Sequence, residues 1–204
     1  MRYLQLKKTV KCGNSASLNM TIELSTERTR LRLIESSDLD SIHILHSLPE
    51  TDKYNTLGIP DSIEETKSVI EPWVIENESS SPRNYTFAIE NTTNDDFIGL
   101  FGLKPGKAKF KRAEVWYKIH PEYWNKGIAT EVLGRIIDYG FNELKLHRIE
   151  AGCAVENIGS IKVLEKAGMV REGRRRQILP LKSGWSDNFE YAILETDKRK
   201  PNTT

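Results

Sequence analysis

The sequence has few cysteines, no long apolar run and almost no net charge, and each absence excludes a class of protein. Its two cysteines, Cys12 and Cys153, lie far apart and have neither metal-ligand spacing nor the density of a disulfide-rich secreted domain. No apolar stretch could span a bilayer, and the first twenty residues lack the apolar core of a signal peptide. We therefore expect a cytoplasmic protein with no metal site and no membrane partner.

The near-zero net charge argues against a partner that is bound mainly by electrostatic attraction. The 30 basic and 29 acidic residues leave a net charge of +1, which gives no global field for binding nucleic acid. One basic cluster is present, formed by Arg171, Arg174, Arg175 and Arg176. It could contact RNA or a phosphate, but no aromatic residues interleave it, and a solvated strand explains it better. We expect no nucleic-acid partner.

The length of 204 residues suits one domain with a sizeable core. We assign that domain to residues 26–197. Residues 1–25 are polar and weakly periodic, which indicates a flexible N-terminal extension, and residues 198–204 read as a disordered polar tail.

The first half of the domain predicts strands and helices in alternation. A strand from Thr29 should open the sheet, and Ser37 with Asp40 resembles a capping box at the start of a helix that ends before Pro49. A second helix over 62–77 should be kinked or restarted by Pro72. His43 and His46 read as ordinary helix residues. Strands follow at 85–89, at 97–103 and from Ala113.

The most informative stretch runs from Trp116 to Glu131 and changes period at a turn. Before the turn Val115, Tyr117 and Ile119 alternate with Trp116 and Lys118 as in a strand, which Pro121 ends. After it, apolar residues recur at helical spacing from Ile128 to Phe141. Small residues at the helix start leave unpaired N–H groups open to an anion, which the helix dipole favours. Gly127 also has a simpler explanation as a residue that permits the turn.

The last third supplies one more strand, a helix and a closing hairpin. The strand Arg148–Ala154 must have a parallel neighbour because it follows a crossover helix. Asn157 is suited to cap the next helix and Gly168 to end it. Residues 169–181 and 188–194 form the predicted hairpin.

Together these motifs resemble a known family. The run from Trp124 to Glu131, with Asn157, Ser160 and the segment Glu165-Lys166-Ala167-Gly168-Met169, is similar to the GNAT acetyltransferases and specifically to their RimJ/RimL-type branch. The resemblance covers about 26–196. It implies an α+β fold (α/β/α layered) with a mixed, mostly antiparallel central sheet of about seven strands flanked by helices. Trp124 stands where much of the family has Gln or Arg, although the RimJ/RimL-type branch commonly has an aromatic residue there.

The resemblance also implies acetyl-CoA as cosubstrate and assigns residues to its binding. The expected cradle for the pyrophosphate consists of Asn125, Lys126, Gly127, Ile128, Ala129 and Thr130. The backbone N–H of Ile119 is expected to bind the thioester oxygen as an oxyanion donor. Asn157 could hydrogen-bond the pantetheine amides or serve only as a helix cap, and Ser160 is expected near the departing sulfur.

Acetyl transfer to an amine needs a base and an acid. Glu114 is our candidate for the base, reached through water, with an exposed strand glutamate as the alternative. Ser160 is the candidate acid for the leaving thiolate. Tyr117 competes for that role, or else belongs to the core or the pocket wall.

The acceptor is the least determined part of the prediction. A protein or peptide N-terminal α-amine is preferred because the RimJ/RimL-type resemblance points there and because its pKa near 8 asks less of a base than a lysine near 10.4. A small amine (polyamine, aminoglycoside or amino-acid derivative) and a non-catalytic CoA-binding protein remain alternatives, and homodimerisation stays open. The segments expected to border the amine are Tyr54–Pro60, Pro72-Trp73 and the hairpin with Trp185 and Asp187, with Glu64, Glu65 and Glu71 nearby.

Overall fold

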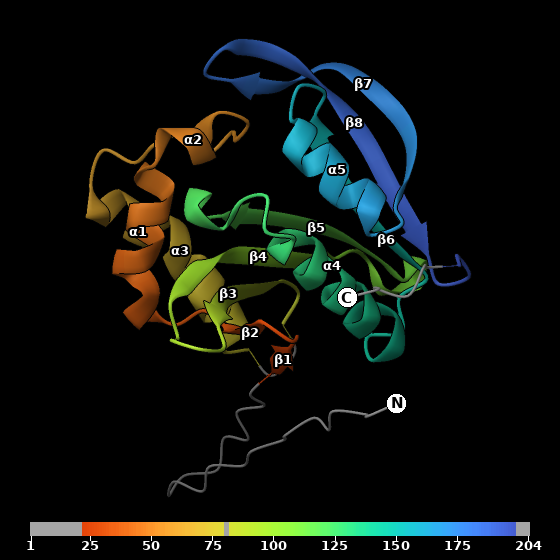
Figure 1. Cartoon of the computed structure of the whole chain (residues 1–204), viewed down its shortest axis with the longest axis horizontal. Helices are drawn as coiled ribbons and strands as arrows, with labels where there is room; N and C mark the ends of the chain where they lie inside the picture. Colours follow the sequence, from red (N-terminus) through yellow and green to blue (C-terminus); the bar gives the residue numbers. More distant parts are fainter. Residues whose placement is uncertain (1–21, 80–81, 199–204) are drawn as a thin grey trace, which may run out of the picture.

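The computed structural model describes residues 22–79 and 82–198, and within them one mixed sheet runs in the order β1-β2-β3-β4-β5-β6-β8-β7 (Figure 1). The strands are β1 (Glu23–Ser25), β2 (Thr29–Leu33), β3 (Tyr85–Asn91), β4 (Phe97–Pro105), β5 (Arg112–Ile119), β6 (Arg148–Ala154), β7 (Val170–Leu181) and β8 (Gly184–Leu194). The α-helices are α1 (Leu39–Ser47), α2 (Pro49–Asp52), α3 (Ile63–Asn77), α4 (Ile128–Asn142) and α5 (Ile158–Lys166).

The predicted α+β fold is confirmed, with a correction at its N-terminal edge. The described residues contain eight strands rather than about seven, and the additional one is β1. Leu24 of β1 is fully buried and lies opposite Leu31 of β2. The strand from Thr29 therefore does not open the sheet, because β1 lies at its edge. The expectations for residues 1–21 and 199–204 lie outside the described residues.

Strand pairing follows the expected hairpins and one crossover. The pairs from β1 to β5 are antiparallel, and so are β6 with β8 and β7 with β8. β5 and β6 are parallel, because α4 connects them as a crossover helix. The β3–β4 and β7–β8 hairpins form between the strands expected there, although β8 begins at Gly184 rather than at residue 188.

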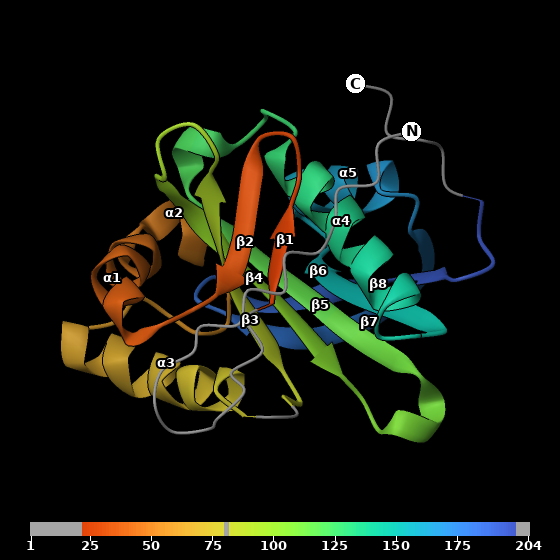
Figure 2. The ribbon, with the colours of Figure 1, turned by 90° about the horizontal axis from the view of Figure 1, so that it is seen from below.

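Helices cover both faces of the sheet (Figure 2). On one face α4 and α5 bury the larger core, in which Val132, Leu133 and Ile136 pack with Phe101 and Ile149 of the strands. On the other face α1 and α3 bury a smaller core with Ala88 and Leu100. Because side chains alternate along a strand, β5 contributes to both faces at neighbouring positions.

Two local predictions for the helices need correction. The turn before α1 is capped by Asp38, whose carboxylate accepts the N–H of Glu35 at 2.8 Å, rather than by Ser37 and Asp40. α3 continues through Pro72 as one helix and does not restart there. Ile70 and Val74 on either side of the proline are buried, and this packing outweighs the lost backbone hydrogen bond.

Membrane insertion has no candidate segment in the described part of the chain. No helix within residues 22–79 and 82–198 combines the length and the apolar character needed to cross a bilayer.

Candidate active site

The central geometric feature is the point where β5 and β6 separate. Their parallel ladder runs from the Arg112–Arg148 pair to the Val115–Ala151 pair. β5 continues to Ile119 against β4, while β6 continues to Ala154 against β8. A V-shaped opening, which we call the splay, therefore lies beyond Val115 and Ala151.

Backbone donors of β5 point into the splay. The N–H of His120 donates to the carbonyl of Ile98, which makes that residue pair a hydrogen-bonded one. Hydrogen-bonded and non-hydrogen-bonded pairs alternate along an antiparallel ladder, so Ile119 and Tyr117 belong to non-hydrogen-bonded pairs with β4. Their N–H groups therefore point away from β4, toward the side that β6 has left. This is the position expected for the Ile119 oxyanion donor. The Ile119 carbonyl is already occupied, because the indole Nε1 of Trp124 donates to it at 2.7 Å.

The expected pyrophosphate cradle lies at the open end of the same strand. Gly127 caps α4 in the left-handed region at φ 77°, which favours glycine, and Asn125 also has a positive φ of 58°. Residues 124–127 are exposed, whereas Ile128 anchors the helix in the core. The nearest described atom to an added β-carbon at Gly127 would be Arg28 Nη2 at 3.5 Å. The turn is therefore accessible to an anionic ligand.

Arg28, which the sequence reasoning missed, holds this cradle in place. Its Nη1 donates to the carbonyl of Lys126 at 2.9 Å, and its Nε donates to Glu131 Oε2 at 2.7 Å. Burial disfavours the Glu131 charge, but contacts with Thr26 and Arg28 prevail and lower its pKa. Glu131 thus ties α4 to the β1–β2 turn. A basic residue in an N-terminal turn carries no local signal of this role.

The two candidate acids meet on the face of the sheet that α4 and α5 cover. The Tyr117 ring stacks on Phe101 with centroids 5.8 Å apart, and its buried hydroxyl has no hydrogen-bond partner among the described residues. Burial raises the pKa of Tyr117, and the nearby Ser160 offsets part of the rise. Asn157 accepts the N–H of Ser160 at 3.1 Å, so it is a helix cap whose amide NH₂ stays available to a ligand. A buried orphan hydroxyl beside Ser160 fits a polar ligand in the splay.

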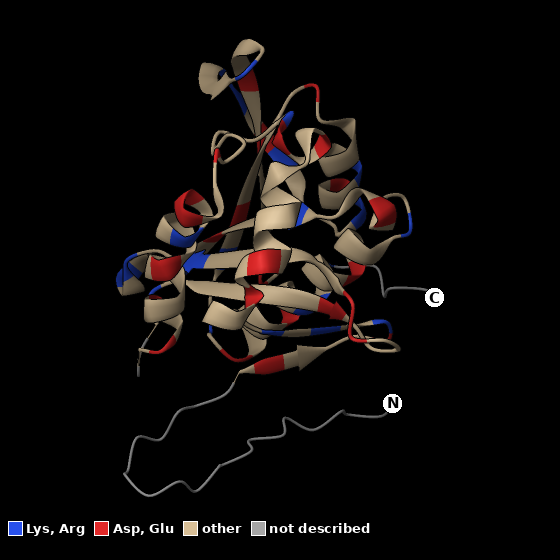
Figure 3. Cartoon of the chain, turned by 90° about the vertical axis from the view of Figure 1, so that its left-hand side faces the viewer, with Lys and Arg blue, Asp and Glu red and all other residues tan. Residues whose placement is uncertain are grey.

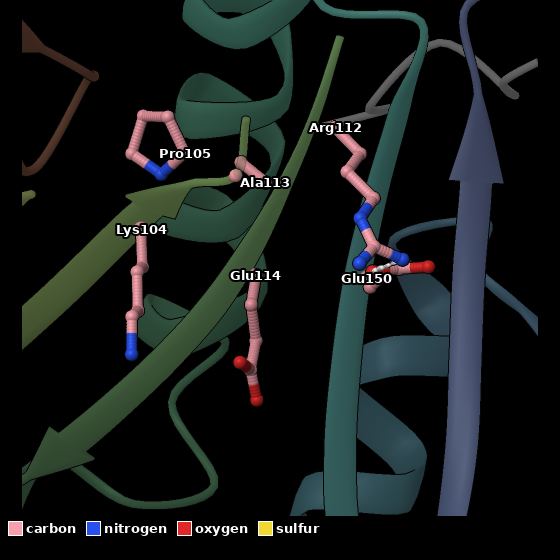
Figure 4. Close-up of a pocket in the computed structure, with 7 residues that line it drawn as sticks. Lys104, Pro105, Arg112, Ala113, Glu114 and Glu150 are labelled. Atoms are coloured by element: carbon pink, nitrogen blue, oxygen red, sulfur yellow. Dashed lines mark ion pairs between the residues drawn. The ribbon is translucent and has the colours of Figure 1, made fainter. Parts of the chain in front are cut away.

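Glu114, the candidate base, lies on the opposite face of the sheet. It precedes the splay by one ladder pair and lines a cavity of about 130 Å³ with Lys104, Arg112 and Glu150 (Figure 4). Arg112 reaches toward Glu150 rather than Glu114, with an N–O distance of 3.7 Å. Glu150 also accepts from Arg148 at 2.7 Å. Glu114 therefore keeps its carboxylate free of the arginines that engage its neighbour.

An aromatic wall follows on the same face. Trp116 is the first β5 residue past the ladder, and its indole lies over Gly102, where an added β-carbon would be 2.0 Å from Nε1. Trp73 of α3 packs against Trp116 with centroids 5.5 Å apart, and His46 meets Trp73 edge-on at 6.4 Å. Burial lowers the pKa of His46 to about 4, with Lys118 and His43 adding to the shift. The indole pair therefore rests on a neutral imidazole.

The comparison with family models decides the identity of this arrangement. The model of the acetyltransferase (GNAT) domain matches residues 28–170. The chain belongs to the GNAT acetyltransferases. It is an acetyl-CoA-dependent N-acetyltransferase, and the open cradle, the splay and the orphan Tyr117 hydroxyl are suited to holding that cosubstrate.

Individual relatives agree with this family. The chain is 33% identical to the uncharacterized N-acetyltransferase YoaA of Bacillus subtilis over 84% of this chain and 96% of the relative. It is 34% identical to the putative ribosomal N-acetyltransferase YdaF of B. subtilis, over 43% and 48% of the two chains. The solved structure of spermidine N-acetyltransferase from Vibrio cholerae with CoA and spermine is 27% identical and superposes with a TM-score of 0.73, covering 83% and 96%.

The segments expected to border the amine are only partly brought together. Trp73 reaches the splay through Trp116, as described above. Asp187 is engaged elsewhere, because it accepts from Arg174 Nε and from the N–H of Gln177. Trp185 is 66% exposed on the hairpin. The three α3 glutamates, Glu64, Glu65 and Glu71, are exposed, and Glu65 caps the N–H of Asp61.

The arginine cluster of this acetyltransferase is largely paired with the neighbouring strand. Arg174 pairs with Asp187, Arg175 pairs with Glu190, and Arg171 lies over the Phe189 ring. Basic and acidic residues alternate along the ribbon on the side of the molecule drawn in Figure 3. These contacts support the interpretation of β7 as a solvated strand.

Proposed function

We propose that this enzyme acetylates the α-amine of a protein or peptide N-terminus, as in the RimJ/RimL-type branch, by direct attack of the amine on acetyl-CoA in a ternary complex. The observation that carries the proposal is the charge where β5 and β6 separate: Glu114 is free of arginines, whereas its ladder partner Glu150 is neutralised by two arginines. A single amine could be met there by Glu114. A polyamine would bring further cations to this stretch of β5 and β6, where the second carboxylate is already paired.

In the proposed mechanism, the proton is taken from the amine on one face of the sheet and a proton is given to the departing sulfur on the other face. Glu114 would take the proton of the α-amine through water, and Trp116 would present an aromatic wall beside the entering cation. The N–H of Ile119 would stabilise the oxyanion. Ser160 would return a proton to the departing sulfur, with Tyr117 as the competing donor. Glu114 and Tyr117 lie on opposite faces of β5 because side chains alternate along a strand, and Ser160 of α5 lies on the Tyr117 face, so base and acid would reach the splay from opposite sides.

A small amine is the second candidate because of one relative. Spermidine N(1)-acetyltransferase of V. cholerae is 30% identical over 81% of this chain and 92% of its own length. The partial similarity to the putative ribosomal N-acetyltransferase supports the protein acceptor instead. The two relatives therefore point to different acceptors, and the charge argument favours the α-amine.

A rate comparison tests the proposal. Release of free CoA would be followed with Ser- and Ala-starting peptides, spermidine and an aminoglycoside as acceptors. An N-terminally blocked peptide with one internal lysine is the control that separates α-amines from side-chain amines. We expect the free-N-terminus peptides to give the highest kcat/KM. A tenfold or greater preference for spermidine or the aminoglycoside contradicts the proposal, and acetyl-CoA binding without turnover of any acceptor would indicate a non-catalytic CoA-binding protein.

A further inference from the structure

Two opposite charges are buried on the acceptor side of β5 without forming a contact. Lys118 of β5 is 5% exposed and Asp52, the last residue of α2, is 4% exposed. Neither Lys118 Nζ nor Asp52 Oδ1 has a hydrogen-bond partner among the described residues. A buried ionisable group without a partner is strongly disfavoured, so this arrangement calls for a function.

The two groups are close enough to influence each other. Burial lowers the pKa of Lys118 to about 8, and the charge of Asp52 offsets part of that effect. They belong to elements with different roles: β5 carries the Ile119 N–H and leads into the cradle, whereas α2 leads into the loop at 54–60. A movement of α2 toward β5 would bring the ammonium and the carboxylate into contact.

We propose that Lys118 and Asp52 are positioning residues that form an ion pair when the acceptor binds, drawing α2 and the 54–60 loop onto the acceptor side of the splay. The proposal rests on the proposed function insofar as the amine enters from this face. Closure would pair the Lys118 ammonium with the Asp52 carboxylate, so that neither buried group lacks a partner. Because the acceptor is bound in the closed form, acceptor binding and pair formation stabilise each other. The pair acts through the loop and touches no reacting atom.

The groups that surround Lys118 define the expected pH dependence. The charge of Asp52 acts on it from α2, and His46 of α1 lies within electrostatic range of it, with His43 beside His46. On β4 its cross-strand partner is Leu100. His46 is neutral over the working range because its pKa is about 4. The pair needs a protonated Lys118. Its contribution to acceptor binding is therefore fully present below about pH 8, the pKa of the unpaired Lys118, and is lost as the pH rises above 8 through the higher pKa of the paired ammonium.

Four variants test the pair. Lys118→Met and Asp52→Asn each remove one charge, the double variant removes both and leaves no unpaired buried charge, and Asp52→Glu keeps the carboxylate. Lys109→Met, which removes an exposed lysine in the β4–β5 turn, is the matched control. Acceptor KM and kcat would be measured from pH 6.5 to 9 with the acceptor that the wild type turns over best. Acetyl-CoA affinity would be measured by calorimetry.

We expect acceptor KM to rise roughly tenfold at pH 7 in each single variant. The double variant should show the same roughly tenfold rise, because the two substitutions break one interaction and their effects do not add. Acetyl-CoA affinity and Lys109→Met should stay within about twofold of wild type, and Asp52→Glu should restore a low KM. The difference in acceptor KM between the wild type and the variants should shrink above about pH 8. Because the single variants could fold poorly, the double variant decides: a wild-type acceptor KM and pH profile there overturns the proposal. So does an equal loss of acetyl-CoA affinity, which would indicate a merely structural role. The outcome does not depend on which acceptor the wild type prefers.

Discussion

The two faces of β5 beyond the splay are built in different ways. The face with Tyr117 and Ile119 is assembled from one continuous segment, because β5, the cradle, α4, β6 and the start of α5 follow each other along the chain. The face with Trp116 and Lys118 is completed by α1, α2 and α3 from a distant part of the sequence. On our proposal, the cosubstrate side is thus mostly local in sequence, with Arg28 as its distant tether, whereas the acceptor side depends on tertiary contacts.

The largest expected effect comes from closing the cradle on the local face. Gly127→Glu should abolish measurable acetyl-CoA binding, because it places bulk and negative charge where the pyrophosphate is expected. Calorimetry on folded protein is the measurement. Gly127→Ala separates the strain of the positive φ from the charge effect, and Gly173→Glu, at a glycine with open space around it, is the matched control. Unchanged affinity in folded Gly127→Glu would remove the cradle assignment.

A second prediction separates the two faces by pH. Ser160→Ala should lower kcat about tenfold across the pH range, equivalent to ~1.4 kcal/mol of barrier. Glu114→Gln should lower it most at low pH, where the amine is protonated and a base is needed, and least at high pH. Full pH–rate profiles of both variants are required. Losses well below tenfold in both would mean that these side chains are not the acid and the base.

A third prediction concerns the tether between the N-terminal turn and α4. Arg28→Ala should weaken acetyl-CoA binding about threefold, a modest effect because Arg28 is half-exposed and such pairs contribute little. Since the folded pKa of Glu131 is lowered, the pair's stabilisation is present above its ordinary value of 4.5 and is lost as the pH falls through the folded pKa. Titrations of wild type and Arg28→Ala at pH 7 and under acid conditions would show it. The tether has no role in binding if the two proteins bind acetyl-CoA equally at pH 7.

The smallest expected effect concerns Tyr117. Tyr117→Phe removes a buried hydroxyl with no partner, so the free energy of unfolding should stay unchanged or rise by about 1 kcal/mol. Urea denaturation measures this. If Ser160 is the acid, kcat should change less than twofold. A kcat loss larger than that of Ser160→Ala would transfer the acid role to Tyr117.

The sequence predicted the parts of the site that depend on local pattern. The β5–turn–α4 unit, the Asn157 cap and the parallel β5–β6 pair all follow from period, glycine position and crossover length, and the structure has them. The roles of the site residues in catalysis and binding remain predictions.

The rest could not be predicted because it depends on contacts between distant segments. Arg28 meets Glu131 across 103 positions, and nothing around Arg28 distinguishes it from a surface arginine. Lys118 reads as the polar residue of an alternating strand, yet α1 and α2 cover it. Pro72 predicted a kinked or restarted helix, and tertiary packing keeps α3 continuous, so it does not restart. Strand β1 was too short for a period to be recognised.

The connection between β2 and β3 has a consequence for how acceptor preference can diverge. The helices α1, α2 and α3 form one insertion between two strands that are neighbours in the sheet, and Leu33 at the start of the insertion lies opposite Phe87 near its end. A different segment inserted here only has to connect the end of β2 to the start of β3, which are already neighbours in the sheet. Arg28 lies before the insertion and the cradle lies after it. Grafting a relative's residues 34–84 onto this chain should therefore transplant acceptor preference while the cosubstrate site is inherited unchanged.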